Sequence, residues 1–119
     1  MPITATELTG MRCKACEGGL PPLSAEQVRD FLKAVPDWQL TGDGRRIRRE
    51  WRVKDFAAGL EFFRRVGEVA EAEDHHPDLH LSDYRNVTVE IWTHALGGLS
   101  ENDFILAAKI DRLPVELKA

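Results

Sequence analysis

The stretch EDHHPDLHL at residues 73–81 marks the change from a helical pattern to a strand pattern in this chain. Before it, residues 54–73 (KDFAAGLEFFRRVGEVAEAE) repeat apolar side chains at helical spacing, and after it DLHLSDY and NVTVEIWTH alternate as strands do. Pro77 pushes the preceding residue toward extended geometry, so we expect the helix to end before the histidines. The stretch holds three of the four histidines of the chain, and the fourth is His94.

The composition indicates one soluble domain. The chain has 119 residues, enough for a single core, and its 43% hydrophobic and 30% charged content is typical of globular proteins. A net charge of −4 argues against general binding to nucleic acids or anionic membranes. No apolar run approaches the ~18 residues of a membrane helix, and the N-terminus lacks the apolar core of a signal peptide. We therefore expect a cytoplasmic protein.

The remaining segments complete an alternation of helices and hairpins. Residues 24–35 open with Ser24 and Gln27, a capping-box pair, and predict a helix. Residues 37–53 predict a hairpin that turns at TGDG, and residues 97–113 predict a last helix with Ser100 as N-cap. The order α-β-β-α-β-β-α predicts an α+β domain, a four-stranded antiparallel sheet with three helices packed on one face. We expect this domain over residues 24–114, between an N-terminal arm (1–23) and a C-terminal tail (115–119).

The long helix has a wide apolar face. One stripe is predicted to comprise Phe56, Leu60, Phe63, Gly67 and Ala70. Three further residues widen it, namely Phe62, Val66 and Val69. So wide a face is expected to contact both the sheet and something else, such as another subunit.

The two cysteines and the arginine-rich strand each allow more than one interpretation. Cys13 and Cys16 form a C-x-x-C pair, but no apolar strand precedes them and Gly and Pro residues follow, which disfavours a redox motif. They are half of a zinc site, which His80 or a second subunit could complete; we favour an arm with two reduced cysteines. The five arginines of residues 45–52 suggest either an acidic partner or, as we favour, the solvated face of a sheet.

Three interpretations of the histidines compete. A structural role at a helix end suits His80 taken alone. A metal site is disfavoured because the adjacent His75 and His76 point to opposite sides of an extended chain, while Pro77 removes the helix that would align His76 with His80.

Metal-free acid–base catalysis is the third interpretation. Imidazole titrates near neutrality, so several histidines together can both donate and accept protons. Glu71, one helical turn before His75, is expected to orient it or tune its charge. Such a set suits the removal of water from a small polar molecule.

The same residues resemble the signature of the pterin-4a-carbinolamine dehydratases. The match begins in EAEDHHPDLHLSDY and continues through WTHALGGLSEND, with a likeness that extends over roughly residues 24–113. The matching positions are Glu71, His75, His76, Pro77, Tyr84, His94 and Asp103. The segment MRCKACEGGLPPL makes the chain look closer to the plant and bacterial branch of that family.

The resemblance implies the helix-and-hairpin fold, assembly as homodimers or homotetramers, and a reaction that needs no metal or organic cofactor. In that reaction a 4a-hydroxytetrahydropterin, the small-molecule substrate, loses water and becomes quinonoid dihydropterin. The implied catalytic residues are His75, His76, His94 and Glu71. The implied substrate-binding residues are Asp74, His75, His76, Trp92, Thr93, His94 and Ala95.

The resemblance also allows a second function. The plant and bacterial branch includes dehydratase-like proteins that act in Rubisco assembly, so a non-enzymatic assembly factor is the alternative, and a hydroxylase or Rubisco is the implied protein partner. Two signature residues are assigned structural roles here. Asp103 stands three residues after Ser100 and is expected to cap the last helix, and Tyr84 is expected to pack in the core.

Overall fold

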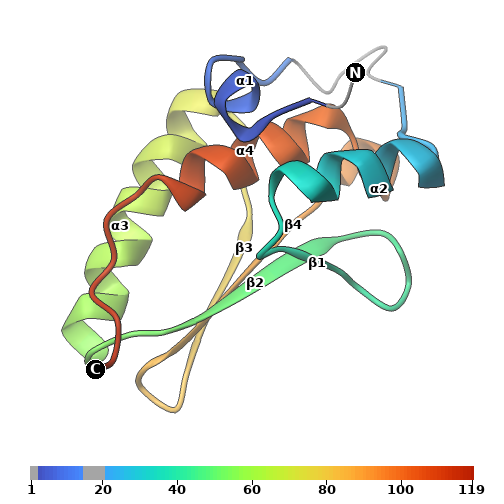
Figure 1. The fold of residues 1–119 in the computed structure, drawn as a ribbon. Helices are drawn as coiled ribbons and strands as arrows, with labels where there is room; N and C mark the ends of the chain where they lie inside the picture. Colours follow the sequence, from blue (N-terminus) through green and yellow to red (C-terminus); the bar gives the residue numbers. More distant parts are fainter. Residues whose placement is uncertain (1–2, 15–20) are drawn as a thin grey trace.

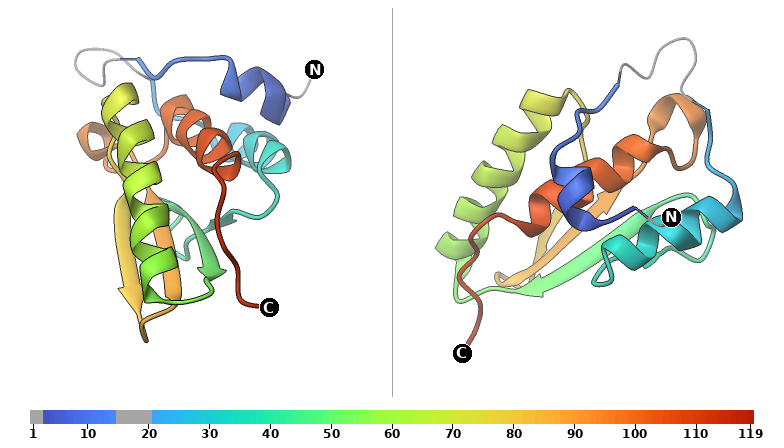
Figure 2. Two further views of the ribbon diagram at one scale, coloured as in Figure 1. Left: turned by 90° about the vertical axis from the view of Figure 1, so that its left-hand side faces the viewer. Right: turned by 45° about the horizontal axis from the view of Figure 1, so that its top comes forward.

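The computed structural model describes residues 3–14 and 21–119. Within these ranges four strands form one antiparallel sheet in the order β1-β2-β4-β3, with the helices on one of its faces (Figures 1 and 2). The strands are β1 (Gln39–Leu40), β2 (Ile47–Arg52), β3 (Asp78–Ser82) and β4 (Asn86–Ile91). The helices are α1 (Ala5–Thr9), α2 (Ala25–Ala34), α3 (Phe56–Glu73), the 3-10 turn η1 (His94–Leu96) and α4 (Glu101–Asp111). The predicted α+β architecture is confirmed, with α1 as an addition that packs against α4.

The sheet has one apolar face and one polar face, because side chains alternate along its strands. On β2, Ile47 and Trp51 are buried under the helices, whereas Glu50 points to solvent from the opposite face. On β4, Val87 and Val89 are fully buried. The core therefore lies between the sheet and the helices, and the other face of the sheet is open.

Side-chain caps start the helices where the sequence indicates. Ser24 accepts a hydrogen bond from the Gln27 backbone, and the Gln27 side chain accepts one from the Ser24 backbone, so the predicted capping box begins α2. Asp55 caps α3 by accepting from the Ala58 backbone at 2.8 Å. These caps satisfy N–H groups that have no partner within the helix.

The predicted core face of α3 is partly wrong. The buried row consists of Gly59, Phe62, Val66 and Ala70. Phe56 and Leu60 are 51% and 49% exposed, although both were placed on the core stripe. Gly59 explains why the buried face of α3 differs from the predicted one, since a Cβ built there would lie only 3.2 Å from Leu81 Cδ1. Because Gly59 has no side chain, α3 can approach β3 closely. The predicted stripe followed the large apolar residues and therefore left this glycine out of the buried face.

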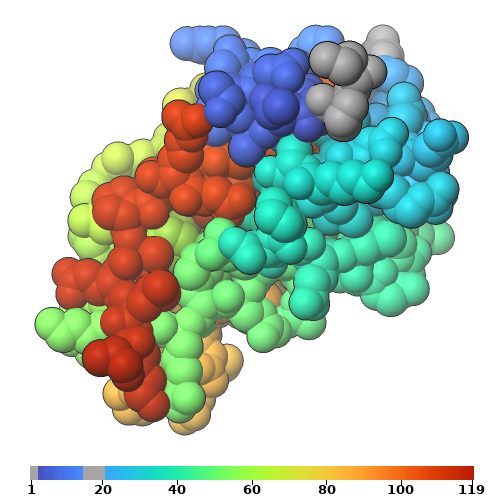
Figure 3. Space-filling view, viewed as in Figure 1, coloured from blue at the N-terminus to red at the C-terminus, as the bar shows by residue number. Residues whose placement is uncertain are grey.

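Segments near both ends of the described chain pack on the domain. Leu8 of α1 is fully buried in the core. At the other end, the Lys54 backbone donates to the Glu116 carbonyl and the Lys118 backbone donates to the Arg52 carbonyl, at 2.9 Å each. The C-terminal tail is thereby hydrogen-bonded to the chain at the end of β2. Figure 3 shows the red atoms of this tail along the surface.

The expectation that Tyr84 packs in the core is wrong. It is exposed and lies with Asp83 in the turn between β3 and β4, where both residues have positive φ angles.

In the part of the chain that the structure describes, no helix combines the length and the apolar character that a membrane crossing requires.

Candidate active site

The sheet brings the histidine segments to one end of the molecule. β3 begins at Asp78, and β4, its antiparallel neighbour, ends at Ile91, with Asp78 paired to Glu90. The chain that enters β3 and the chain that leaves β4 therefore lie side by side. The first carries His75 and His76, and the second carries His94.

The end of α3 sends the adjacent histidines in opposite directions. Asp74 adopts the left-handed conformation (φ 51°, ψ 41°), while the His75 backbone donates to the Ala70 carbonyl at 3.1 Å and the Asp74 backbone to the Glu71 carbonyl at 3.3 Å. This pair of bonds is a Schellman motif. After it, His75 turns inward and is 5% exposed, whereas the His76 side chain is 55% exposed.

A buried hydrogen-bond cluster fixes His75. Its Nε2 donates to Asp103 Oδ1 at 2.6 Å. Asp103 Oδ2 accepts from the Thr93 hydroxyl at 2.9 Å and from the Ser100 backbone at 2.8 Å. The hydroxyls of Thr93 and Ser100 lie 2.6 Å apart and share a further hydrogen bond. The cluster joins the end of α3, the end of β4 and the start of α4, and it sets the orientation of the His75 ring.

Asp103 therefore does more than the sequence indicates. Its predicted role as the reciprocal cap of α4 is confirmed. Its contact with His75 was missed, because the two residues are 28 positions apart and the cap alone accounts for an acidic residue three positions after Ser100. The match of Asp103 to the family signature was the signal that pointed to this role.

Glu71 contacts a different histidine from the one expected. Its Oε2 accepts from His76 Nε2 at 2.6 Å, and both side chains are exposed. The expectation that Glu71 orients His75 is wrong, because the left-handed turn at Asp74 carries His75 to the interior and leaves His76 beside the last turn of α3.

His94 and Trp92 form the second side of the site. Their ring centroids lie 4.3 Å apart at an interplanar angle of 54°. Between them, Thr93 is fully buried and its backbone N–H donates to the Gly98 carbonyl at 2.8 Å, closing the loop around η1. His94 and Ala95 are exposed at the start of η1. Of the residues expected to bind substrate, Thr93 thus lies inside the protein and Trp92, His94 and Ala95 reach its surface.

The N-terminal arm contacts residues that neighbour the buried hydrogen-bond cluster. The Cys13 backbone donates to Glu73 Oε1 at 2.8 Å. Asn102 accepts from the Lys14 backbone N–H at 2.9 Å and donates to the Lys14 carbonyl at 2.7 Å. Glu73 stands two residues before His75 and Asn102 one residue before Asp103. The arm therefore holds both segments of the buried cluster.

The metal interpretation involves Cys13, Cys16 and His80, of which the structure describes two. Burial, followed by the charge of Glu73, raises the pKa of the Cys13 thiol to about 12. Cys16, the other half of the predicted pair, lies outside the described residues. Across residues 3–14 and 21–119, no three His, Cys, Asp or Glu side chains are arranged to hold a metal ion. His80 is exposed on β3.

Fold and site together define an α+β domain that carries three histidines at one end of its sheet. Comparison with known proteins places it more closely. Residues 21–113 match the family model described as pterin 4 alpha carbinolamine dehydratase. The chain therefore belongs to the pterin-4a-carbinolamine dehydratase family.

Individual relatives agree with this assignment. The chain is 50% identical over 113 residues to pterin-4-alpha-carbinolamine dehydratase 2, mitochondrial, of Arabidopsis thaliana, covering 92% of this chain and 60% of that protein. It is 45% identical over 112 residues to a putative pterin-4-alpha-carbinolamine dehydratase of Methylococcus capsulatus, covering 94% and 97%. The crystal structure of a transcriptional coactivator/pterin dehydratase from Brucella melitensis matches with a TM-score of 0.71 at 30% identity, covering 76% of this chain and 96% of that one.

Proposed function

We propose that this protein dehydrates a 4a-hydroxytetrahydropterin to quinonoid dihydropterin by histidine acid–base catalysis. The observation that carries the proposal is the arrangement at one end of the sheet, where Asp103 hydrogen-bonds the buried His75. The exposed His76 follows His75 in the chain, and the exposed His94 lies on the segment that leaves β4. Membership of the family supports a pterin as the substrate class.

The chemistry requires one proton donor and one proton acceptor. A protonated imidazole gives its proton to the C4a hydroxyl, the C4a–O bond breaks, and water leaves. A neutral imidazole takes the N5 proton, and the N5–H bonding electrons form the N5=C4a double bond. An imidazole side chain can act as either donor or acceptor, so two histidines can perform both steps.

The exposed histidines are the groups that a pterin can reach. We assign the proton transfers to His76 and His94, and we assign to His75 the role of fixing the shape of the site through Asp103. Glu71 accepts a hydrogen bond from His76 and thereby orients its ring. Asp74 and Ala95 are exposed beside these histidines and complete the proposed binding surface.

A dehydration assay on freshly generated 4a-hydroxytetrahydropterin, followed by ultraviolet absorbance against the spontaneous rate, tests the proposal. His76→Ala and His94→Ala should each lower turnover by ~10²-fold or more with unchanged melting curves, because proton transfer is lost and little packing is. His80→Ala is the matched control, since His80 is exposed on β3, and it should keep full activity. Normal turnover in either test variant contradicts the assignment.

Protein association is a second property that one observation favours. Phe56 and Leu60 expose apolar surface one helical turn apart on α3. We propose that a second copy of this chain covers them. Light scattering should show a wild-type oligomer that Leu60→Glu dissociates, and a wild-type monomer at high concentration contradicts the proposal.

If the folded protein does not accelerate dehydration, the alternative of a non-enzymatic protein-binding factor replaces the dehydratase proposal.

A further inference from the structure

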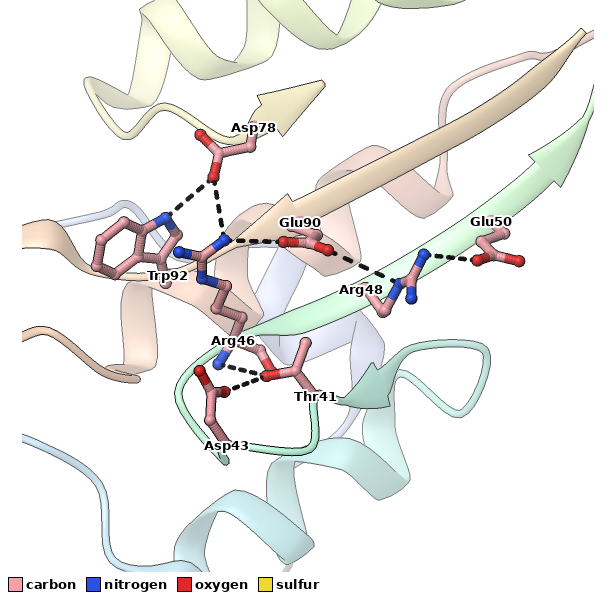
Figure 4. Close-up of polar contacts among 8 residues, drawn as sticks. All are labelled: Thr41, Asp43, Arg46, Arg48, Glu50, Asp78, Glu90 and Trp92. Carbon is pink, nitrogen blue, oxygen red and sulfur yellow. Dashed lines mark hydrogen bonds and ion pairs between the residues drawn. The ribbon is translucent and has the colours of Figure 1, made fainter. Parts of the chain in front are cut away.

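A charged network on the open face of the sheet lies next to the candidate site and has no part in the proposed proton transfers (Figure 4). Arg46 Nη1 donates to Glu90 Oε1 at 3.0 Å and lies 3.8 Å from Asp78 Oδ2. The same Asp78 oxygen accepts from Trp92 Nε1 at 3.2 Å. The Arg46 guanidinium also stands 4.6 Å from the centre of the Trp92 ring.

The backbone around Arg46 fixes where this side chain starts. The Thr41 backbone donates to the Arg46 carbonyl at 2.9 Å, and the Arg46 backbone donates to the Thr41 hydroxyl oxygen at 3.2 Å. Asp43 in turn accepts from the Thr41 hydroxyl at 2.7 Å. Because Ile47 pairs with Ile91, the next position along the register brings Arg46 opposite Trp92.

Trp92 is therefore held at two points. Its indole N–H is bound by Asp78 and its ring is stacked against the Arg46 guanidinium. The same ring contacts His94. Asp78 stands two residues after His76, so the network connects both histidine segments of the site.

The expected contribution of Arg46 is to orientation more than to stability. The side chains of Arg46 and Asp78 are 37% and 40% exposed, and ion pairs this open to water stabilise a fold little. A planar guanidinium that is held by a carboxylate nevertheless restricts the ring on which it stacks. A ring so restricted limits the positions open to an imidazole packed against it.

We propose that Arg46 is a positioning residue that acts through Trp92 to fix the ring of His94. This inference rests on the proposed function, in which His94 transfers a proton. Arg46 holds Trp92, and Trp92 holds the imidazole at the angle that the reaction needs. A displacement of about 1 Å at such a group is enough to slow a reaction severely.

Three variants test the proposal. Arg46→Met removes the charge and keeps much of the length, and Arg46→Lys restores the charge without the planar group. Arg48→Met is the matched control. Arg48 lies on the same face of β2, hydrogen-bonds Glu50 and lies 3.9 Å from Glu90 in the same network, while its removal leaves the guanidinium on Trp92 in place.

Two measurements are needed, one of them independent of activity. In the side-chain NMR spectrum, with His94 assigned from its loss in His94→Ala, Arg46→Met should move the His94 ring resonances and weaken their Overhauser contacts to Trp92. In the assay, Arg46→Met should lower kcat about tenfold while KM and the melting temperature stay close to wild type. Arg46→Lys should give values between those of Arg46→Met and wild type. Arg48→Met should match wild type in both the NMR spectrum and the assay.

The outcomes separate this inference from the proposed function. Unchanged His94 resonances in Arg46→Met, or an equal effect of Arg48→Met, would overturn the positioning role. A fall in melting temperature that accounts for the lost activity would also overturn it. If the wild-type protein has no dehydratase activity, the proposed function fails, and the NMR comparison still decides whether Arg46 sets the position of His94.

Discussion

At the scale of single residues, the backbone conformation of Asp74 separates the two adjacent histidines. Its left-handed conformation ends α3 and sends His75 inward and His76 outward. An ordinary L-residue pays roughly 1–2 kcal/mol for that conformation, and aspartate tolerates it better than most. The separate surroundings of the two adjacent histidines therefore depend on one backbone conformation.

Asp74→Gly should stabilise the fold by about 0.5–1 kcal/mol, because relief of the left-handed strain exceeds the extra entropy of glycine in the unfolded chain. Urea unfolding measures the change. Asp74→Ala is the matched control, since it also removes the carboxylate and keeps the Cβ, and it should be less stable than Asp74→Gly. The reverse order would show that the Asp74 side chain itself stabilises the turn. If the carboxylate binds the pterin, both variants should raise KM alike.

At the scale of elements, the packing of α3 on the sheet decides which residues of this helix are structural. Phe62 is buried and contacts the Trp51 ring at a centroid distance of 4.9 Å. Leu60, two positions earlier, is half exposed because Gly59 is the residue that faces β3. Residues that look equivalent in the apolar pattern therefore differ in what their loss should cost.

Phe62→Ala should destabilise the protein by about 3–5 kcal/mol, the usual cost of removing a fully buried aromatic ring. Leu60→Ala should cost less than about 1 kcal/mol in the monomer, since little of its side chain is removed from water. Chemical denaturation at low protein concentration compares the two. Equal losses would show that the face of α3 is misplaced.

At the scale of the whole molecule, the N-terminal arm, α3 and α4 meet at Glu73. Glu73 accepts from the Cys13 backbone and from Lys109, whose Nζ lies 2.9 Å from Glu73 Oε2. Burial alone would raise the pKa of Glu73, but the hydrogen bonds from Lys109 and Cys13, together with the charge of Lys109, lower it below its usual range. The contact joins segments that are about 60 and 36 residues apart in the chain.

A lowered pKa in the folded state makes the contribution of Glu73 dependent on pH. The unfolded chain binds the proton more tightly, so the stability from Glu73 is present above its ordinary pKa and is lost as the pH falls through the lowered value. Glu73→Gln should cost about 2 kcal/mol at pH 7, the scale of a hydrogen bond to a charged group. Its difference from wild type should shrink as the pH falls to about 4 and below.

Urea unfolding at pH 7 and at pH 4 measures this difference. Glu68→Gln is the matched control, because Glu68 pairs with Arg64 on the exposed side of the same helix and such pairs contribute little. A Glu73→Gln difference that stays constant between the two pH values would contradict the role assigned to this carboxylate.

Features that depend on neighbours in the chain could be predicted from the sequence. Ser24 and Gln27 predicted the start of α2, and the TGDG turn predicted the hairpin of β1 and β2. The order of these elements was sufficient for the α+β architecture, because hairpins and caps are decided by a few adjacent residues. The histidines of the candidate site could be named for the same reason, as members of one short signature.

The partners of those residues were decided only by the tertiary structure. His75 meets Asp103 because the end of α3 and the start of α4 converge beside β4, and Arg46 meets Trp92 because β2 and β4 pair in one register. The exposed face of α3 follows from the contact of Gly59 with Leu81. The sequence alone determined the order of the elements and named the residues that are proposed to carry the chemistry. Packing between segments distant in the chain determined which of those residues touch, because such contacts depend on strand register and helix orientation, which no local pattern specifies.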